Sequence, residues 1–179
     1  MNIYICMSNF AMDNKPGAEV CPGRNNLVLE ISNTPYICTF KMYDWQRLYL
    51  DGKPRPINIE RAMENLNFDR KGKKVQRKLI SRPNTIFSTD EGRIVDLPTH
   101  PEHIYDVHRL EIVRSMEFHT KNRVHILNVV EGGKVEIITK HRKLVVNDAE
   151  TFIIPASVGS YHIENRGSSV VKIVKAFLK

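Results

Sequence analysis

The second half of the chain consists almost entirely of short apolar stretches separated by turn residues. Valine, isoleucine and aromatic residues dominate the stretches, and glycine, asparagine, aspartate or proline lie between them. Strands this short and this regularly spaced are typical of a β-sandwich or a β-barrel. The stretches expected to form strands are 93–97, 105–113, 123–130, 134–139, 143–146, 151–154, 161–165 and 169–178.

The segment NVVEGGKVEII, residues 128–138, carries the clearest turn signal in this half. Two apolar stretches flank Glu131-Gly132-Gly133. Adjacent glycines favour the backbone conformations of tight turns between antiparallel strands. We therefore expect a β-hairpin whose two strands pair with each other.

The first half is less regular. Residues 26–32 and 35–43 are enriched in β-branched and aromatic side chains, which indicates two strands. Asn58 is a good helix N-cap, and apolar residues follow it at helical spacing, which predicts a short helix. These apolar residues are Ile59, Ala62, Met63 and Leu66. The expected divisions of the chain are 1–52, a helix and basic connector at 53–93, and a barrel at 94–179.

The positive charge is concentrated in one segment. Residues 53–82 hold ten Lys and Arg against three Asp and Glu, which accounts for the whole net charge of +7. Such a segment suits a sugar phosphate or a nucleic acid, although a solvated helix and a charged loop is the simpler interpretation. No aromatic residue lies between Arg70 and Arg82 for a single strand to stack on. Nucleic-acid binding is therefore the weakest functional reading.

The sequence also bears on where the protein works. No apolar run reaches the 18 or so residues of a membrane span, and the start, MNIYICMSNFAMDN, has no basic region typical of a secretory signal. The three cysteines are scattered and odd in number, which suits a reducing compartment better than a disulfide framework. We expect a cytoplasmic protein without a membrane partner.

Several longer motifs resemble a known family. The motifs are NNLVLEIS, TFKMYDW, LDGKPRP, AMENL and FDRKG, followed by LPTHPEHIYDVHRLE, VVEG, AETFIIPA and VKIVKAF. In this order they resemble the C-terminal part of type I mannose-6-phosphate isomerase-like proteins, over roughly residues 24–179. The resemblance implies a mainly β protein with a C-terminal degenerate cupin (jelly-roll) barrel. A short helix and a partial remnant of the catalytic cupin, at 1–52, would precede that barrel.

The same resemblance implies an aldose–ketose isomerase that interconverts mannose 6-phosphate and fructose 6-phosphate beside a zinc ion. The family's zinc ligands include a Gln-x-His pair, and the only glutamines here, Gln46 and Gln76, are not followed by one. Cys21 lies where the last ligand histidine is expected, and one thiolate does not make a zinc site. We therefore expect this chain to bind no zinc and to be inactive alone.

Two arginines match the substrate side of the family pattern. In DWQRLYLDGKPRP, the alignment places the catalytic arginine on Arg47 and a substrate-binding residue on Arg55. A guanidinium group suits both tasks, because its fixed fork of donors grips phosphate and stabilises a developing enediolate charge. The alternative is that both are surface arginines flanking a turn.

The histidines of the second half invite a metal interpretation, which the spacing disfavours. Cupin metal sites use a His-x-His pair, and the corresponding place here reads His119-Thr120-Lys121, with a cation in the second position. His162 lies seven residues after Pro155, two later than the usual cupin spacing, and Ser160 occupies the place where a cupin ligand is expected. We expect no metal in this barrel and a His162 that packs or faces solvent.

Three functions remain open at this point. The chain is a partial isomerase, a non-enzymatic cupin module that binds a sugar phosphate or a protein partner, or a nucleic-acid binder. The first 23 residues join abruptly to a family-like strand, which favours a fragment of a longer enzyme. A separate complementing chain would then supply the missing metal-binding half.

Overall fold

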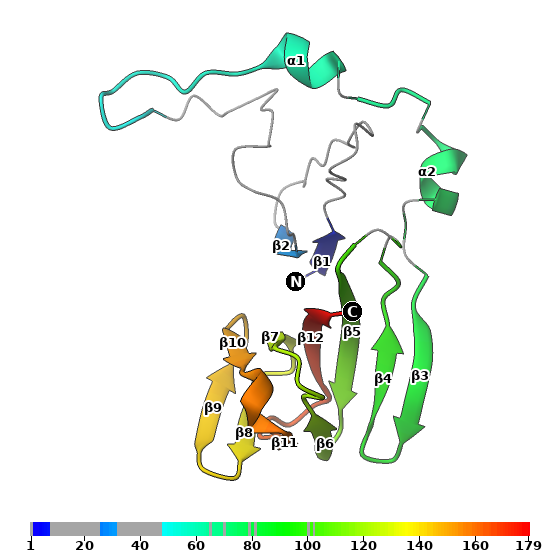
Figure 1. Cartoon of the computed structure of the whole chain (residues 1–179), viewed down its shortest axis with the longest axis vertical. Helices are drawn as coiled ribbons and strands as arrows, with labels where there is room; N and C mark the ends of the chain where they lie inside the picture. The colour runs from blue at the N-terminus through cyan, green and yellow to red at the C-terminus, as the bar shows by residue number, and fades with distance from the viewer. Residues whose placement is uncertain are drawn as a thin grey trace. The chain divides into compact units, whose positions relative to one another are not determined.

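The computed structural model describes residues 2–7, 26–31, 48–64, 66–69, 71–78, 80, 82–99, 101 and 103–179. The chain divides into two compact units, residues 1–80 and 81–179, and the second unit contains all of the barrel strands (Figure 1). Among the described residues, no helix is long and apolar enough to cross a lipid bilayer.

The described residues of the first unit include two short strands and two short helices. Strand β1 (Asn2–Met7) pairs in parallel with β2 (Asn26–Ile31), and helix α1 spans Ile59–Glu64, as its N-cap and spacing predict. Helix α2 (Lys73–Lys78) lies within the basic segment that the sequence indicated as a connector. The strand expected at 35–43 lies outside the described residues, as does most of the predicted cupin remnant.

The larger sheet of the second unit has six antiparallel strands in the order β10-β7-β12-β5-β4-β3 (Figure 1). Its strands are β3 (Asn84–Thr89), β4 (Gly92–Asp96), β5 (Tyr105–Ile112), β7 (His125–Glu131), β10 (Thr151–Ile154) and β12 (Val171–Leu178). Strand β12 lies between β5 and β7, so the last strand of the unit is central in the sheet.

The smaller sheet has four antiparallel strands in the order β6-β11-β8-β9. Its strands are β6 (Ser115–His119), β8 (Lys134–Thr139), β9 (Lys143–Asn147) and β11 (Ser160–Asn165). A single 3₁₀ turn, η2 (Ala156–Val158), carries the chain from β10 into β11 and from one sheet to the other.

The two sheets enclose one apolar core. In most strands alternate residues point inward, as in β11, where Tyr161 and Ile163 are buried and His162 between them is exposed. The larger sheet contributes Leu110, Ile112, Leu127, Val129, Phe152, Ile154, Val171 and Ile173 to this core. The smaller sheet contributes Met116, Phe118, Val135, Ile137, Val146, Tyr161 and Ile163.

The prediction of a β-hairpin at 128–138 is wrong. Strand β7 pairs with β10 and β12, whereas β8 pairs with β9 and β11, so consecutive strands lie in different sheets. Gly132 and Gly133 have φ angles of 104° and 97°, which favour glycine, and they carry the chain across the barrel. A Cβ atom on Gly132 would lie 2.6 Å from the carbonyl oxygen of Val170. The paired glycines therefore serve a close crossing between sheets rather than a hairpin.

The sheet also extends beyond the strands that the sequence indicated. Strand β6 was not predicted, and β3 lies in the segment 53–93 that was interpreted as a helix and connector. Because β3 pairs with β4 and β4 with β5, the sheet begins at Asn84, upstream of the expected barrel start.

Candidate functional site

Polar side chains replace apolar ones at the same end of three neighbouring strands. On the core-facing side of β12, Lys175 follows the core residue Ile173 by two positions. On the same side of β5, His108 precedes a core leucine by two positions, and His125 does so on β7. Lys175 is the register partner of His108, so both side chains occupy adjacent positions on one face of the sheet. Together with Tyr161 and Asp96 they form what we call the barrel-end cluster.

Lys175 is the most deeply placed cation of this cluster. The residue is 8% exposed, and its Nζ lies 4.7 Å from the centre of the Phe177 ring and 5.8 Å from that of Phe118. Aromatic faces attract an ammonium group, but they do not replace its hydration fully. Burial, with a smaller effect of Lys121, lowers the pKa of Lys175 to about 8.

A histidine–tyrosine pair lies next to Lys175. The Nδ1 atom of His125 and the hydroxyl of Tyr161 are 2.8 Å apart, and both residues are buried. Burial, followed by the charges of Lys175 and His108, lowers the pKa of His125 to about 4. Burial also raises the pKa of the Tyr161 hydroxyl. At neutral pH the imidazole and the phenol are therefore both uncharged and hydrogen bonded to each other.

His108 connects the cluster to solvent. Its Nε2 atom lies 3.8 Å from Oδ1 of Asp96, and its side chain is 19% exposed. Its ring packs edge-on against Phe177 at 4.8 Å. The Nδ1 atom is buried and has no hydrogen-bond partner among the described residues. Burial and the charge of Lys175 lower the pKa of His108, against the opposing effect of Asp96 and Asp106.

The histidines that a cupin zinc centre would use do not fit a zinc ion. The backbone N–H of Lys121 donates to Nδ1 of His119 (2.8 Å), and the Thr120 hydroxyl between them donates to the carbonyl of Ala156 (2.7 Å). His162 is on the exposed face of β11, with its Nε2 3.9 Å from Oε2 of Glu117. Over the described ranges, no three His, Cys, Asp or Glu residues lie together as a ligand set.

The structure leaves the two arginines predicted from the family pattern untested. Arg47 lies outside the described residues, and Arg55 is half-buried in the segment that leads into α1. Leu48 and Pro54 form an isolated β-bridge in this segment, which places Arg55 just after a closed turn. Arg55 belongs to the first unit and the barrel-end cluster to the second. The roles of both arginines stay predictions.

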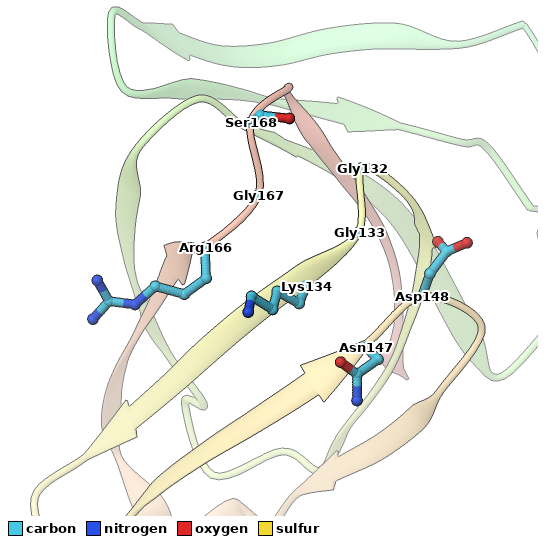
Figure 2. Close-up of a pocket in the computed structure, with 8 residues that line it drawn as sticks. All are labelled: Gly132, Gly133, Lys134, Asn147, Asp148, Arg166, Gly167 and Ser168. Atoms are coloured by element: carbon cyan, nitrogen blue, oxygen red, sulfur yellow. The ribbon is translucent and has the colours of Figure 1, made fainter.

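A shallow depression lies at the opposite end of the barrel, among the turns that follow β7, β9 and β11. Its volume is about 420 Å³, and it is lined by Gly132, Gly133, Lys134, Asn147, Asp148, Arg166, Gly167 and Ser168. Its charged side chains do not converge, and Arg166 points away from the glycine turns (Figure 2). Arg166 forms ion pairs with Glu136 and, at 2.5 Å, with Glu164. Because its guanidinium is already neutralised, this depression is the weaker candidate site.

The sequence contains a signal for the barrel-end cluster that strand prediction alone does not use. In VVKIVKAF, the alternate positions Val171, Ile173, Lys175 and Phe177 share one face, and a lysine interrupts that apolar face. The same reasoning on β5 and β7 finds a histidine at the edge of an apolar face. The sequence alone does not reveal which of these faces meet, because that depends on the order of the strands in the sheet.

The sheet order and the shared core define a jelly-roll barrel of the cupin type, and comparison with known proteins supports this fold. No protein-family model and no curated protein matches the sequence. The structure is similar to that of the mannose 6-phosphate isomerase from Bacillus subtilis, with a TM-score of 0.55 and 19% sequence identity. That match covers 76% of this chain and only 39% of the isomerase.

Two further similar structures have smaller scores. The cupin domain of Cnp3 from Schizosaccharomyces pombe has a TM-score of 0.44 at 16% identity, with 54% of this chain and 68% of that chain covered. Ectoine synthase from P. lautus has the same TM-score and identity, with coverages of 51% and 67%. The predicted mainly β fold with a C-terminal cupin barrel is confirmed. At these identities the likeness concerns the fold.

Proposed function

We propose that this chain is the C-terminal portion of a mannose-6-phosphate isomerase-like aldose–ketose isomerase. The observation that supports the proposal is the match to the Bacillus subtilis isomerase, which covers 76% of this chain but 39% of that enzyme. The ordered motifs from NNLVLEIS to VKIVKAF point to the same family. In this proposal Arg47 stabilises developing charge on the enediolate and Arg55 holds the sugar phosphate.

The chain alone is then without turnover. The family's Gln-x-His zinc pair does not occur in the sequence, and the described histidines of the barrel belong to no group of three potential metal ligands. A separate polypeptide would have to provide the metal-binding half. We also propose a cytoplasmic location, since the three cysteines form no disulfide pattern. Nucleic acid and membrane are not among the proposed partners.

The first test measures the conversion of mannose 6-phosphate to fructose 6-phosphate by the purified chain, once with added zinc and once with a chelator. No turnover is expected in either condition. Zinc-dependent turnover would contradict the assignment of the metal ligands to a missing half. Absence of turnover is also expected of a binding module, so a second experiment has to separate these two functions.

A chimaera provides this separation. The matching part of the Bacillus subtilis isomerase is replaced by this chain, so that the metal-binding half is present. The proposal is supported if Arg47→Lys lowers the activity of the chimaera and Arg55→Met raises its KM for the sugar phosphate. Lys53→Met, which removes an exposed cation of the same segment, is the matched control. A folded but inactive chimaera would contradict the isomerase assignment.

The second candidate is a non-enzymatic cupin module that binds a sugar phosphate. The barrel-end cluster favours it, because a buried lysine and a histidine with an unused nitrogen lie side by side at one end of the barrel. A ligand held there needs neither a zinc ion nor the missing half. A protein partner is the remaining form of this candidate, and binding of such a partner without any effect of sugar phosphate would favour it.

A further inference from the structure

Lys175 carries a buried charge that no described anion balances. The residue is 8% exposed, and no carboxylate among the described residues forms an ion pair with it. Lysines are almost never buried without a partner, because removing an ammonium group from water is costly. The ring of Phe177, 4.7 Å away, compensates only part of this cost.

His108 leaves a second polar group unused beside this charge. Its Nδ1 atom is buried and has no partner in the described part of the chain, whereas Nε2 faces Asp96. Buried polar atoms without a hydrogen bond are uncommon, and each one calls for an explanation such as a water or an ion. Because His108 and Lys175 are register partners, both unused groups belong to one place in the sheet.

We propose that the barrel-end cluster binds a small-molecule oxyanion, a phosphate monoester or a carboxylate, between Nζ of Lys175 and Nδ1 of His108. Both atoms then donate charge-assisted hydrogen bonds to the anion, which are stronger than bonds between neutral groups. This inference specifies the site of the second candidate function and does not depend on isomerase activity.

The surrounding charges determine how the site responds to pH. Lys121 adds positive potential near Lys175, whereas His125 and Tyr161 are uncharged at neutral pH. The carboxylates that face the site are Asp96 on β4 and Asp106 on β5, both near His108. A protonated His108 donates to the bound anion through Nδ1 and places its charge between that anion and Asp96, so anion binding is accompanied by proton uptake. The affinity therefore falls as the pH rises.

The exposure of the side chains indicates the side from which an anion would reach the proposed site. His108 is 19% exposed and Asp96 is 32% exposed at their side chains, whereas Lys175 lies deeper. An anion thus approaches past His108 and reaches the ammonium group second. A small ligand fits this description, since Phe118 and Phe177 occupy the space around the lysine.

The test titrates the full chain with inorganic phosphate and, separately, with acetate, by calorimetry and by the thermal midpoint. At least one probe is expected to bind and to raise the midpoint. Lys175→Met is expected to weaken binding by about tenfold or more, since it removes a charged donor. Lys172→Met is the matched control, because Lys172 lies on the same strand but pairs with Glu131 on the other face. The Lys172→Met variant is expected to bind the probe with the affinity of the wild type.

The two probes distinguish the sources of the anion. Tighter binding of phosphate assigns a phosphate monoester, and tighter binding of acetate assigns a carboxylate. Binding of neither probe, or equal binding by wild type and Lys175→Met, overturns the proposal.

NMR on the wild-type chain provides a readout that does not depend on the variant folding. The Nδ1 resonance of His108 is expected to shift with the bound probe, whereas that of His162 stays constant. An unshifted His108 contradicts the proposal. These results are independent of the chimaera, whose failure concerns only the isomerase assignment.

Discussion

The hydroxyl of Tyr161 and the Nδ1 atom of His125 are 2.8 Å apart, although their strands belong to different sheets. This hydrogen bond therefore joins β11 of the smaller sheet to β7 of the larger one through the barrel interior. The ring of Tyr161 also stacks on Phe118 at 5.6 Å, so the phenol is oriented from both sides. The polar end of the barrel is thus part of the packing that holds the sheets together.

Tyr161→Phe is expected to lower the free energy of unfolding by about 1–3 kcal/mol, because it leaves Nδ1 of His125 buried without a partner. Urea unfolding of the full chain measures the change. Tyr49→Phe is the control, since Tyr49 is 54% exposed. This substitution is expected to change the free energy of unfolding by no more than about 0.5 kcal/mol. Equal effects of both substitutions would argue against a stabilising role for the buried hydrogen bond.

Acid is expected to destabilise the barrel through His125. The pKa of His125 is about 4 in the folded chain against 6.5 for an ordinary histidine, so the unfolded chain binds the proton more readily. Stability is therefore full above pH 6.5 and falls between pH 6.5 and about 4, by on the order of 3 kcal/mol.

Unfolding of His125→Asn across this pH range checks the assignment. The variant is expected to lose most of the pH dependence, because its amide does not titrate. His162→Asn, which changes an exposed histidine, is expected to keep it. A slope that survives in His125→Asn would assign the acid sensitivity to other groups.

Alkali is expected to stabilise the chain through Lys175. Its pKa is about 8 when folded and 10.5 for an ordinary lysine, so the penalty for burying the charge is complete below pH 8 and disappears by pH 10.5. The gain over this range is on the order of 3 kcal/mol in the absence of a bound anion.

Lys175→Met is expected to be more stable than the wild type at pH 7 by about 1–3 kcal/mol, since replacing a buried charge with an apolar side chain is often stabilising. The pH-dependent gain should also disappear in this variant. Guanidinium unfolding at pH 7 and pH 10 gives both quantities. A destabilised variant would mean that the ammonium group has a partner that its surroundings do not reveal.

The crossing between the sheets is expected to tolerate no side chain at Gly132. Gly132→Ala adds a Cβ atom that meets Val170 and Val171 at 2.6 Å, in addition to the strain of a positive φ. Gly133→Ala has similar strain but nothing within 4 Å of the new atom. The first substitution should cost clearly more than the second, whose cost is about 1–2 kcal/mol. Equal midpoints in urea would contradict the close crossing.

The barrel is expected to begin before the boundary drawn from the sequence. A fragment of residues 81–179 keeps β3 and β4 beside β5, whereas a fragment of residues 94–179 loses β3 and Arg93. Arg93 donates to the buried Glu111 at 2.6 Å, so its loss leaves a carboxylate with one partner fewer. The longer fragment should unfold cooperatively at a higher temperature by calorimetry. A shorter fragment of equal stability would favour the boundary at 94.

The strands with clear alternation and flanking turn residues were predictable, and β6 shows why another was missed. The turn before β6 contains no glycine, proline or asparagine. Glu91 holds it instead: its carbonyl accepts from the N–H of Val113, and its carboxylate binds Arg114 and the N–H of Ser115. A turn fixed by a residue more than twenty positions away has no local signature.

The barrel-end cluster was only partly predictable for a related reason. Each of Lys175, His108 and His125 interrupts an apolar face, which a single strand can reveal. Their meeting depends on β12 lying between β5 and β7, which are far from it in the sequence. The Gly132-Gly133 turn shows the same limit, because identical residues suit a hairpin and a crossing between sheets.

The central position of β12 has a consequence for the nascent polypeptide during translation. Strands β5 and β7 leave the ribosome before β12 and do not pair with each other. Each of them lacks one neighbouring strand until β12 inserts between them. Until residue 178 has emerged, two apolar strands present open hydrogen-bonding edges, which invite pairing with neighbouring chains. Translation that stops short of β12 should therefore yield a species that needs chaperones or aggregates, rather than a smaller folded barrel.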